Sequence, residues 1–220
     1  MKYKTLFLSL ILASSFCRAD SAAGSQEIKP AKMAMDKVSR VYAGGYGGFG
    51  TIDGAYHQDG QFGQFRLSLG CDAYSWDKVT IGVEGGIQSG NTMRLQMKIP
   101  NRDLAGGLYP QMVLKPVIDL LATVRYNFIS KYHLLLKGGA AYRQMQFTDR
   151  TSAKDDLRSV NGELQAGIGY QLTKHTRIVG LYQGIYAHAR TKYQLTTDSY
   201  VLLRHIPLQQ AGFLGVEYAF

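Results

Sequence analysis

The stretch Leu208–Phe220, LQQAGFLGVEYAF, decides the fold of this 220-residue chain. Alternate side chains of a β-strand point to opposite faces. One face of this stretch is apolar and ends in an aromatic residue at the last position: Gly212, Leu214, Val216, Tyr218 and Phe220. The other face is small or charged apart from one phenylalanine: Ala211, Phe213, Gly215, Glu217 and Ala219. This pattern is typical of a strand with lipid on one side and a polar interior on the other. We predict that it closes a transmembrane barrel.

Seven further segments have the length and the alternation of β-strands. We predict strands at 41–50, 64–74, 79–88, 117–128, 132–147, 160–172 and 176–188. The alternation is clear in 64–74, where Phe65, Leu67, Leu69, Cys71 and Ala73 oppose Arg66, Ser68, Gly70, Asp72 and Tyr74. The two faces of 176–188 do not separate cleanly. A shift of one residue would exchange them, so its facing stays open.

The connections between these segments alternate in length, beginning with a long one. Bacterial outer-membrane barrels have an even number of strands, short periplasmic turns and long outer loops. The sequence therefore predicts an all-β fold over residues 40–220, an eight-stranded antiparallel transmembrane β-barrel. With an even count, both ends of the chain lie on the periplasmic side with the short turns.

The polar residues of the strands favour a barrel over a soluble β-sandwich, whose strands would also alternate. A sandwich would expose many Lys, Glu and Thr, whereas here isolated charges of both signs lie among small residues. Strands cross hydrocarbon only as a closed ring, because every backbone polar group must be paired. Eight strands leave an interior about wide enough for side chains. We therefore expect paired charges, a plugged interior and no open pore. The predicted interior charges are Arg66, Asp72, Glu84, Asp119, Arg125, Lys137, Arg143, Glu163 and Glu217.

Aromatic residues gather beside the predicted short turns and at the carboxyl end of the chain. Amphipathic rings favour the interface between membrane and water. We predict a periplasmic aromatic girdle made of Tyr74, Trp76, Tyr126, Phe128, Tyr132, Tyr170, Tyr218 and Phe220.

Residues 1–19 have the features of a secretory signal: two early lysines and an apolar segment too short to span a bilayer comfortably. We expect cleavage after Ala19, with a competing site near Ala22 and a third reading in which Cys17 is lipidated. Residues 20–39 are predicted to form a periplasmic lead-in. After residue 19 no apolar run is long enough for a transmembrane helix.

The net charge of the chain is +9, and removal of a signal with three basic residues lowers it to +6. These charges are not clustered as they are in nucleic-acid-binding proteins. A secreted route also argues against such partners, so we expect no nucleic acid.

Three motifs carry a resemblance to a known family: VYAGGYGGFG at 41–50, GVEGGIQ at 82–88 and GVEYAF at 215–220. The chain resembles the opacity-type, OmpA-like family of eight-stranded surface barrels of Gram-negative bacteria. That resemblance implies a location in the cell outer membrane and a role as a surface antigen, adhesin or structural protein. It also implies that Val216, Tyr218 and Phe220 form the signal read by the outer-membrane assembly machinery. The sequence lacks the peptidoglycan-binding domain of two-domain members, so we do not expect anchoring to the cell wall.

A hydrolase acting on lipid A is the alternative function of a barrel of this size. The best general base would be His188, near the outer end of the seventh predicted strand, but no serine is adjacent to it. His57, His133, His175 and His205 lack the spacing of metal ligands. The glycines of 44–50 lie inside a strand rather than before a helix, which argues against a nucleotide site. We expect no enzyme, cofactor or metal.

The long outer loops carry most of the remaining basic residues. Cations there could contact lipopolysaccharide phosphates or an acidic host glycan. The candidate contacts are Arg94, Lys98, Arg102, Arg190, Lys192 and Arg204. The expected partners are outer-membrane lipid, lipopolysaccharide, the assembly machinery and a host surface ligand. A small porin is a further alternative, which conductance measurements would distinguish.

Overall fold

The computed structural model describes residues 36–53, 58–94, 111–147, 156–186, 193–195, 201–203 and 206–220. Within these ranges the chain is all β. Its strands are β1 (Asp36–Ile52), β2 (Gln61–Trp76), β3 (Val79–Gln88), β4 (Asn91–Arg94), β5 (Gln111–Leu114), β6 (Val117–Ile129), β7 (Tyr132–Phe147), β8 (Asp156–Gln171), β9 (Thr176–Ile185), β10 (Tyr193–Leu195), β11 (Val201–Leu203) and β12 (Gln209–Ala219). No helix among the described residues is long and apolar enough to cross a membrane.

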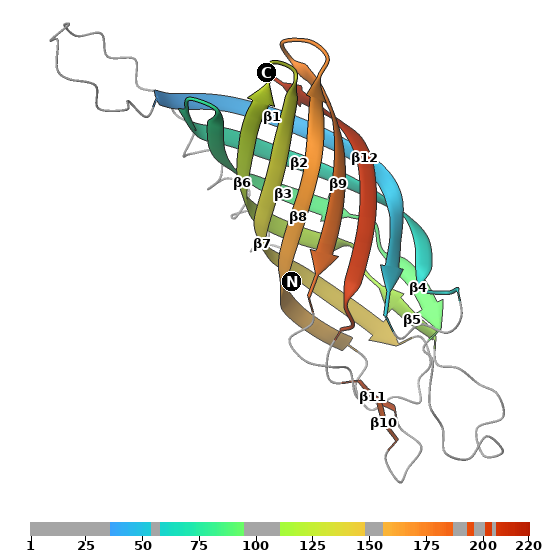
Figure 1. Cartoon of the computed structure of the whole chain (residues 1–220). Helices are drawn as coiled ribbons and strands as arrows, with labels where there is room; N and C mark the ends of the chain where they lie inside the picture. The colour runs from blue at the N-terminus through green and yellow to red at the C-terminus, as the bar shows by residue number, and fades with distance from the viewer. Residues whose placement is uncertain are drawn as a thin grey trace, which may run out of the picture.

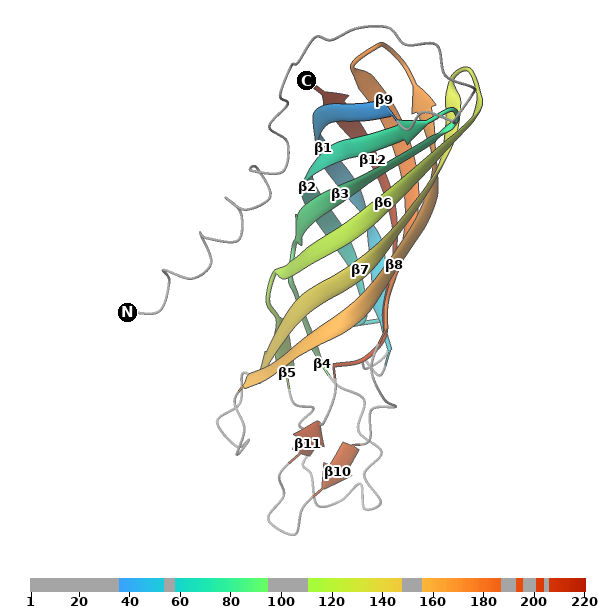
Figure 2. The same cartoon turned by 90° about the vertical axis from the view of Figure 1, so that its left-hand side faces the viewer.

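The strands form a closed antiparallel barrel that crosses from end to end eight times (Figures 1 and 2). β4 continues β3, and β5 precedes β6 in the same way, so each of these pairs makes one crossing. The ring closes where β1 pairs with β12, in register from Tyr42 opposite Ala219 to Ile52 opposite Gln209. The eight-stranded barrel predicted from the sequence is thereby confirmed. The short strands β10 and β11 form a separate two-stranded ribbon.

The two ends of the barrel differ in the length of their connections. We call the end with the connections 77–78, 130–131 and 172–175 the turn end, and the opposite end the loop end. In Figure 1 the C-terminus lies at the turn end, and the ribbon of β10 and β11 lies beyond the loop end. Asp77 adopts a positive φ of 46°, a conformation that Asp tolerates better than most residues. That conformation allows the tight connection from β2 to β3.

Side chains alternate between a buried interior and an exposed outer wall. β6 shows this plainly, because Leu121 is 1% exposed and its neighbour Leu120 is 65% exposed. The same comparison explains why the two faces of the seventh predicted strand, 176–188, do not separate in the sequence. In β9 the interior positions Val179, Leu181 and Ile185 are apolar, while Tyr182 faces outward, so both faces are apolar.

The structure differs from the prediction in several strand bounds and in the facing of one residue. Tyr74 was expected on the interior face, but it lies on the outer wall because the β2–β3 register shifts between Asp72 and Tyr74. The extra residue of such a bulge moves the side chains that follow to the other face. β1 begins at Asp36, with a second irregularity between Lys37 and Arg40. β9 ends at Ile185, three residues before the predicted end.

Two glycines of the closing strands allow close backbone approach. A Cβ atom at Gly48 would lie 1.9 Å from the carbonyl oxygen of Gly212, and one at Gly215 would lie 2.3 Å from the ring of Tyr46. Gly212 itself points outward, and a Cβ atom there would meet nothing within 4 Å. The interior glycines are therefore required by packing, while the outward one is not.

The aromatic residues predicted for the girdle lie together at the turn end. Three of the rings approach one another across adjacent strands, with centroids 6.3 Å apart for Phe128 and Tyr132 and 5.0 Å apart for Tyr132 and Tyr170. Tyr218 and Phe220 meet edge to face at 5.4 Å. This belt gives the outer wall an amphipathic border.

Candidate functional site

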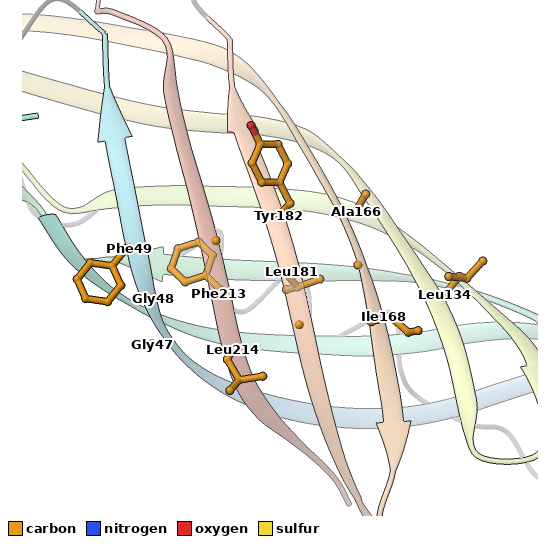
Figure 3. Close-up of a pocket in the computed structure, with 13 residues that line it drawn as sticks. Gly47, Gly48, Phe49, Leu134, Ala166, Ile168, Leu181, Tyr182, Phe213 and Leu214 are labelled. Carbon is orange, nitrogen blue, oxygen red and sulfur yellow. The ribbon is translucent and has the colours of Figure 1, made fainter. Parts of the chain in front are cut away.

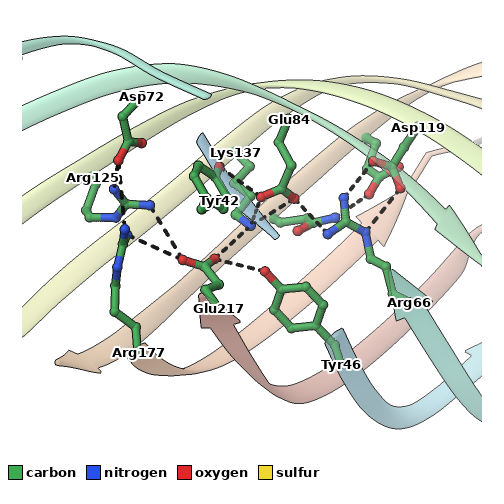
Figure 4. Close-up of polar contacts among 12 residues, drawn as sticks. Tyr42, Tyr46, Arg66, Asp72, Glu84, Asp119, Arg125, Lys137, Arg177 and Glu217 are labelled. Carbon is green, nitrogen blue, oxygen red and sulfur yellow. Dashed lines mark hydrogen bonds and ion pairs between the residues drawn. The ribbon is translucent and has the colours of Figure 1, made fainter. Parts of the chain in front are cut away.

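The interior of the barrel contains a buried set of charges that we call the ionic network. It consists of four basic and four acidic side chains: Arg66, Arg125, Lys137, Arg177, Asp72, Glu84, Asp119 and Glu217. Figure 4 shows these side chains converging across the interior. Equal numbers of each sign make the network formally neutral, which offsets the cost of removing so many charges from water.

Glu217 of β12 lies at the centre of the half of the network nearest the turn end. Its carboxylate lies 3.4 Å from Arg177, 3.6 Å from Arg125 and 3.6 Å from Lys137. Arg125 makes a shorter contact of 2.7 Å with Asp72. Strands far apart in the sequence are thus joined through one carboxylate.

The other half of the network lies nearer the middle of the barrel. Arg66 donates two hydrogen bonds to Asp119, at 2.6 and 3.1 Å, in a bidentate arrangement. It also contacts Glu84 at 2.7 Å, and the Lys137 ammonium lies 2.8 Å from the other oxygen of that carboxylate. Arg66, Glu84 and Lys137 are each no more than 1% exposed. These contacts cross-link β2, β3, β6 and β7.

Two tyrosines of β1 complete the network. Tyr42 donates a hydrogen bond of 3.0 Å to Glu84, and Tyr46 donates one of 2.8 Å to Glu217. The ring of Tyr42 faces the guanidinium groups of Arg125 and Arg177, with centroid distances of 5.5 and 5.7 Å. These contacts have cation–π geometry. The tyrosines therefore fill the interior and stabilise charges of both signs.

Arg143 of β7 is buried nearer the loop end and contacts neutral groups. It donates hydrogen bonds to the side-chain oxygen of Asn161 at 3.1 Å and to the carbonyl oxygens of Pro207 at 2.7 Å and Ile206 at 3.3 Å. The last two residues lie just before β12, separated from it by Leu208. Arg143 thus fixes the point where the chain re-enters the barrel.

Between the ionic network and the loop end lies a group of buried amides and one carboxylate, which we call the glutamine layer. Its members are Gln64, Gln88, Glu163, Gln165, Gln183 and Gln209, all at most 3% exposed. One oxygen of Glu163 accepts hydrogen bonds from the amide groups of Gln165 at 2.6 Å and Gln183 at 2.5 Å. The other oxygen of Glu163 has no hydrogen-bond partner in the protein.

An apolar cluster covers the glutamine layer at the loop end, and we call it the loop-end cap. It consists of Ile52, Met93, Met112, Leu114, Val117, Ala141, Met145, Ile185 and Ile206. All nine are at most 5% exposed. Methionine fills irregular gaps well, so these side chains seal the mouth of the barrel.

The outer wall has an open groove of about 850 Å³, away from the polar interior (Figure 3). Glycines of β1, β8, β9 and β12 contribute to its lining. The large side chains beside it are exposed, as Phe49 at 79%, Tyr182 at 57% and Leu214 at 66% show. This apolar groove faces outward with the rest of the wall.

No protein-family model matches the sequence, and no curated protein matches it. Among solved structures, the outer membrane protein OprG from Pseudomonas aeruginosa is similar, with a TM-score of 0.50 and 14% sequence identity over 84% of this chain and 97% of that chain. Ail of Yersinia pestis, solved in complex with the heparin analogue sucrose octasulfate, has a TM-score of 0.48 and 14% identity over 83% of this chain and 97% of that chain. Neisserial surface protein A has a TM-score of 0.46 and 12% identity over the same shares.

This chain has the fold of an outer-membrane β-barrel. At sequence identities of 12–14%, the similarity to these structures shows the fold and does not show the function.

The structure places all nine predicted interior charges inside the barrel. Seven of them belong to the ionic network, while Arg143 and Glu163 lie nearer the loop end. The proposed assembly residues lie on the outer wall at the turn end of β12, where Val216 is 48%, Tyr218 49% and Phe220 70% exposed.

The predicted loop contacts lie almost entirely outside the described residues. Arg94 is the last residue of β4, at the loop end. Lys98, Arg102, Arg190, Lys192 and Arg204 lie beyond the described ranges.

The histidines do not form a site in the described part of the chain. His133 is buried at the turn end, and a ring nitrogen of His175 lies 2.9 Å from the carbonyl oxygen of Ala219. His57, His188 and His205 fall outside the described residues, and with them the candidate base. The described residues contain no group of three or more His, Cys, Asp or Glu that could hold a metal ion.

Sequence reasoning missed one cation of the ionic network, Arg177, and the two tyrosines that contact the network. Arg177 was not assigned because the facing of its strand stayed open, although its place opposite Glu217 in the β9–β12 register puts it inside. Tyr42 and Tyr46 lie in the predicted strand 41–50, for which no inner face is predicted. Their spacing of four residues, with Gly44 between them, places both on one face of a strand. That spacing was the available signal.

Proposed function

We propose that this protein is an outer-membrane barrel with a closed interior that acts at the cell surface through its outer loops, as a structural and adhesin-like surface protein. The observation that supports this is the filled interior. The ionic network, the glutamine layer and the loop-end cap succeed one another along the barrel. A solute would have to displace paired charges and packed methionines to pass. The proposal therefore assigns the protein neither a porin nor an enzyme role.

The loops supply the chemistry of the proposed role. β4 ends and β5 begins at the loop end, and β9 ends and β12 begins there as well. The connections that carry Lys98, Arg102 and Lys192 therefore start and finish on one side of the barrel. Lys and Arg in those connections suit phosphate groups, and guanidinium groups can bind phosphate in a bidentate manner. We propose the phosphates of lipopolysaccharide as their partner.

Charge reversal tests this proposal. The triple variant Lys98→Glu, Arg102→Glu, Lys192→Glu should bind lipopolysaccharide at least about tenfold more weakly in low salt, because three attractive contacts become repulsive. A matched control reverses Lys78, Lys131 and Lys174, three exposed lysines of the turn end, and should leave binding unchanged. Equal binding by wild type and the loop variant would remove the idea. Loss of binding to a sulfated glycan but not to lipopolysaccharide would reassign the partner to a host surface ligand.

The alternative functions have their own tests. Planar bilayers containing the protein should show no stable, nanosiemens-scale channels, and such channels would restore the porin reading. Mass analysis of lipid A from expressing cells should show no change, and a new deacylated species would restore the hydrolase reading.

Location and processing are proposals of the same kind. We propose that residues 1–19 are removed as a signal, that residues 20–39 lead into the barrel, and that the product resides in the outer membrane of a Gram-negative cell. Its mass after extraction from outer membranes, together with heat-modifiable gel migration, checks all three statements. A product found in the soluble fraction would contradict them.

A further inference from the structure

The glutamine layer contains polar atoms that the protein itself does not satisfy. The amide oxygens of Gln88, Gln165 and Gln183 and one carboxylate oxygen of Glu163 have no hydrogen-bond donor. Neither polar atom of the Gln64 amide or of the Gln209 amide has any partner. Each of these side chains is at most 3% exposed. Burying unpaired polar groups is costly, so an occupant that pairs with these atoms would stabilise the barrel.

The orientation of three of these amides follows from chemistry. A carboxylate only accepts hydrogen bonds, so the amides that contact one must present their NH₂ groups to it. Gln165 and Gln183 do so to Glu163, and Gln88 does so to Asp119 at 3.2 Å. Their oxygens must therefore face away from the carboxylates. The lining is rich in acceptors, and a suitable occupant donates hydrogen bonds or carries positive charge.

Glu163 also lacks a neutralising partner. No basic side chain of the described residues pairs with it, because the cations around it are engaged elsewhere. The Lys137 ammonium, on the neighbouring strand, contacts both oxygens of Glu84 at 3.0 and 2.8 Å. Arg143 donates to Asn161, Pro207 and Ile206. The ionic network contains equal numbers of basic and acidic side chains, so none of its positive charge is left over to neutralise Glu163.

The strand register places the side chains that carry unpaired oxygens on adjacent strands. Ile185 of β9 lies opposite Glu163 of β8 on one side and opposite Gln209 of β12 on the other. Two strand spacings, about 9.5 Å, therefore separate the Cα atoms of Glu163 and Gln209, and both long side chains point inward. Gln183 and Gln165 also pair directly, two residues further along their strands. Three adjacent strands, β8, β9 and β12, thus carry one carboxylate and three amide groups that are buried inside the barrel.

We propose that the glutamine layer binds a single monovalent hard cation of the Na⁺ or K⁺ class, with Glu163 as its anionic ligand and amide oxygens as neutral ligands. Hard cations prefer oxygen donors, and amide-type carbonyl oxygens can replace their hydration shell. One positive charge matches the one unpaired carboxylate. The ionic network closes the site toward the turn end, and the loop-end cap closes it on the other side. The ion would therefore be enclosed as the barrel forms.

The test offers the ion during folding. The mature chain, purified from outer membranes and unfolded in urea, is refolded into detergent micelles in NaCl, KCl or choline chloride at equal ionic strength. After exchange into choline chloride, atomic emission should count one Na⁺ or K⁺ per barrel. The melting temperature should rise by about 3–6 °C for each tenfold increase in cation above its dissociation constant.

Two variants and one control assign the effect to the site. Glu163→Gln should abolish both the retained ion and the dependence on the cation. Asp77→Asn removes an exposed carboxylate in a turn where Asn tolerates the same positive φ, and it should behave as wild type. Gln209→Met removes one oxygen without breaking a hydrogen bond within the protein. It should raise the half-saturating concentration about tenfold, equivalent to about 1.4 kcal/mol.

Equal melting temperatures in all three chlorides, with no retained ion, would overturn the proposal. That result would mean that water fills the layer or that Glu163 carries a proton. An ion retained equally by wild type and by Glu163→Gln would place it elsewhere and would also overturn the assignment.

Discussion

The phenol of Tyr46, in the first strand, donates a 2.8 Å hydrogen bond to the carboxylate of Glu217, in the last strand. The two residues are 171 positions apart in the sequence. Their strands meet only when the barrel closes, and the same carboxylate also contacts Lys137, Arg125 and Arg177. The closing seam and the ionic network are therefore one structure.

The Tyr46 hydroxyl should contribute measurably to the stability of the seam. Tyr46→Phe removes a buried hydrogen bond to a charged group, so we expect unfolding free energy to fall by about 1.5–3 kcal/mol. The matched control is Tyr182→Phe. The Tyr182 hydroxyl donates a 2.7 Å hydrogen bond to Gln210 on the exposed outer wall, and its removal should lower the unfolding free energy only slightly. Urea unfolding in lipid vesicles measures both. A control loss as large as that of Tyr46→Phe would show that the seam bond has no special role.

The bidentate pair of Arg66 and Asp119 should show strong coupling. Each single variant, Arg66→Met or Asp119→Leu, leaves a buried charge unpaired and should cost about 3–5 kcal/mol. The double variant leaves Glu84 paired with Lys137, so its cost should be smaller than the sum of the singles by about 0.5–3 kcal/mol. A double-mutant cycle by equilibrium unfolding measures this difference. Strict additivity would refute the coupling.

Two glycines on neighbouring closing strands should respond in opposite ways to the same change. Gly48→Ala would force a Cβ atom against the carbonyl oxygen of Gly212, so we expect a loss of at least about 1–3 kcal/mol. Gly212→Ala meets open space and should be neutral or stabilise by up to about 1 kcal/mol. Thermal unfolding of both variants under the same conditions checks the contrast. Similar losses in the two would mean that the close approach at Gly48 is not what requires glycine there.

The terminal aromatic should matter for assembly more than for the folded barrel. Phe220→Ser should reduce severalfold the fraction of protein that reaches the outer membrane in its heat-modifiable form. Phe49→Ser removes an equally exposed ring at the loop end, since Phe49 is 79% and Phe220 70% exposed, and should assemble normally. Equal assembly of the two variants would remove the proposed signal at Val216, Tyr218 and Phe220.

Alternation predicted most of the strands because the two faces of this barrel contact opposite environments. The crossings β3 and β7 match the predicted ranges 79–88 and 132–147 at both ends. Where both faces of a strand are apolar, the alternation does not show which face points into the barrel. In β9 the inward side chains Val179, Leu181 and Ile185 are apolar like the outward ones. The sequence therefore does not show which face of β9 points inward, and Arg177 could not be assigned.

Other features depend on relations between strands, which a single strand's pattern does not contain. Tyr74 faces outward because the pairing of β2 with β3 shifts by one residue between Asp72 and Tyr74. Such a bulge is a property of the pairing, and the alternation within β2 alone does not reveal it. The choice of partners in the ionic network depends on the same registers. The charges could be assigned to the interior from the sequence, whereas the contacts of Glu217 with three cations could not.

In the proposed surface role, the loop-end cap separates the residues that close the barrel from the connections that would bind a partner. Its sealing side chains come from strands and from one residue, Ile206, just before β12. The barrier therefore does not require any particular sequence in the longer connections. The amino-acid sequence and the length of those connections can therefore change during evolution without opening a pore through the barrel.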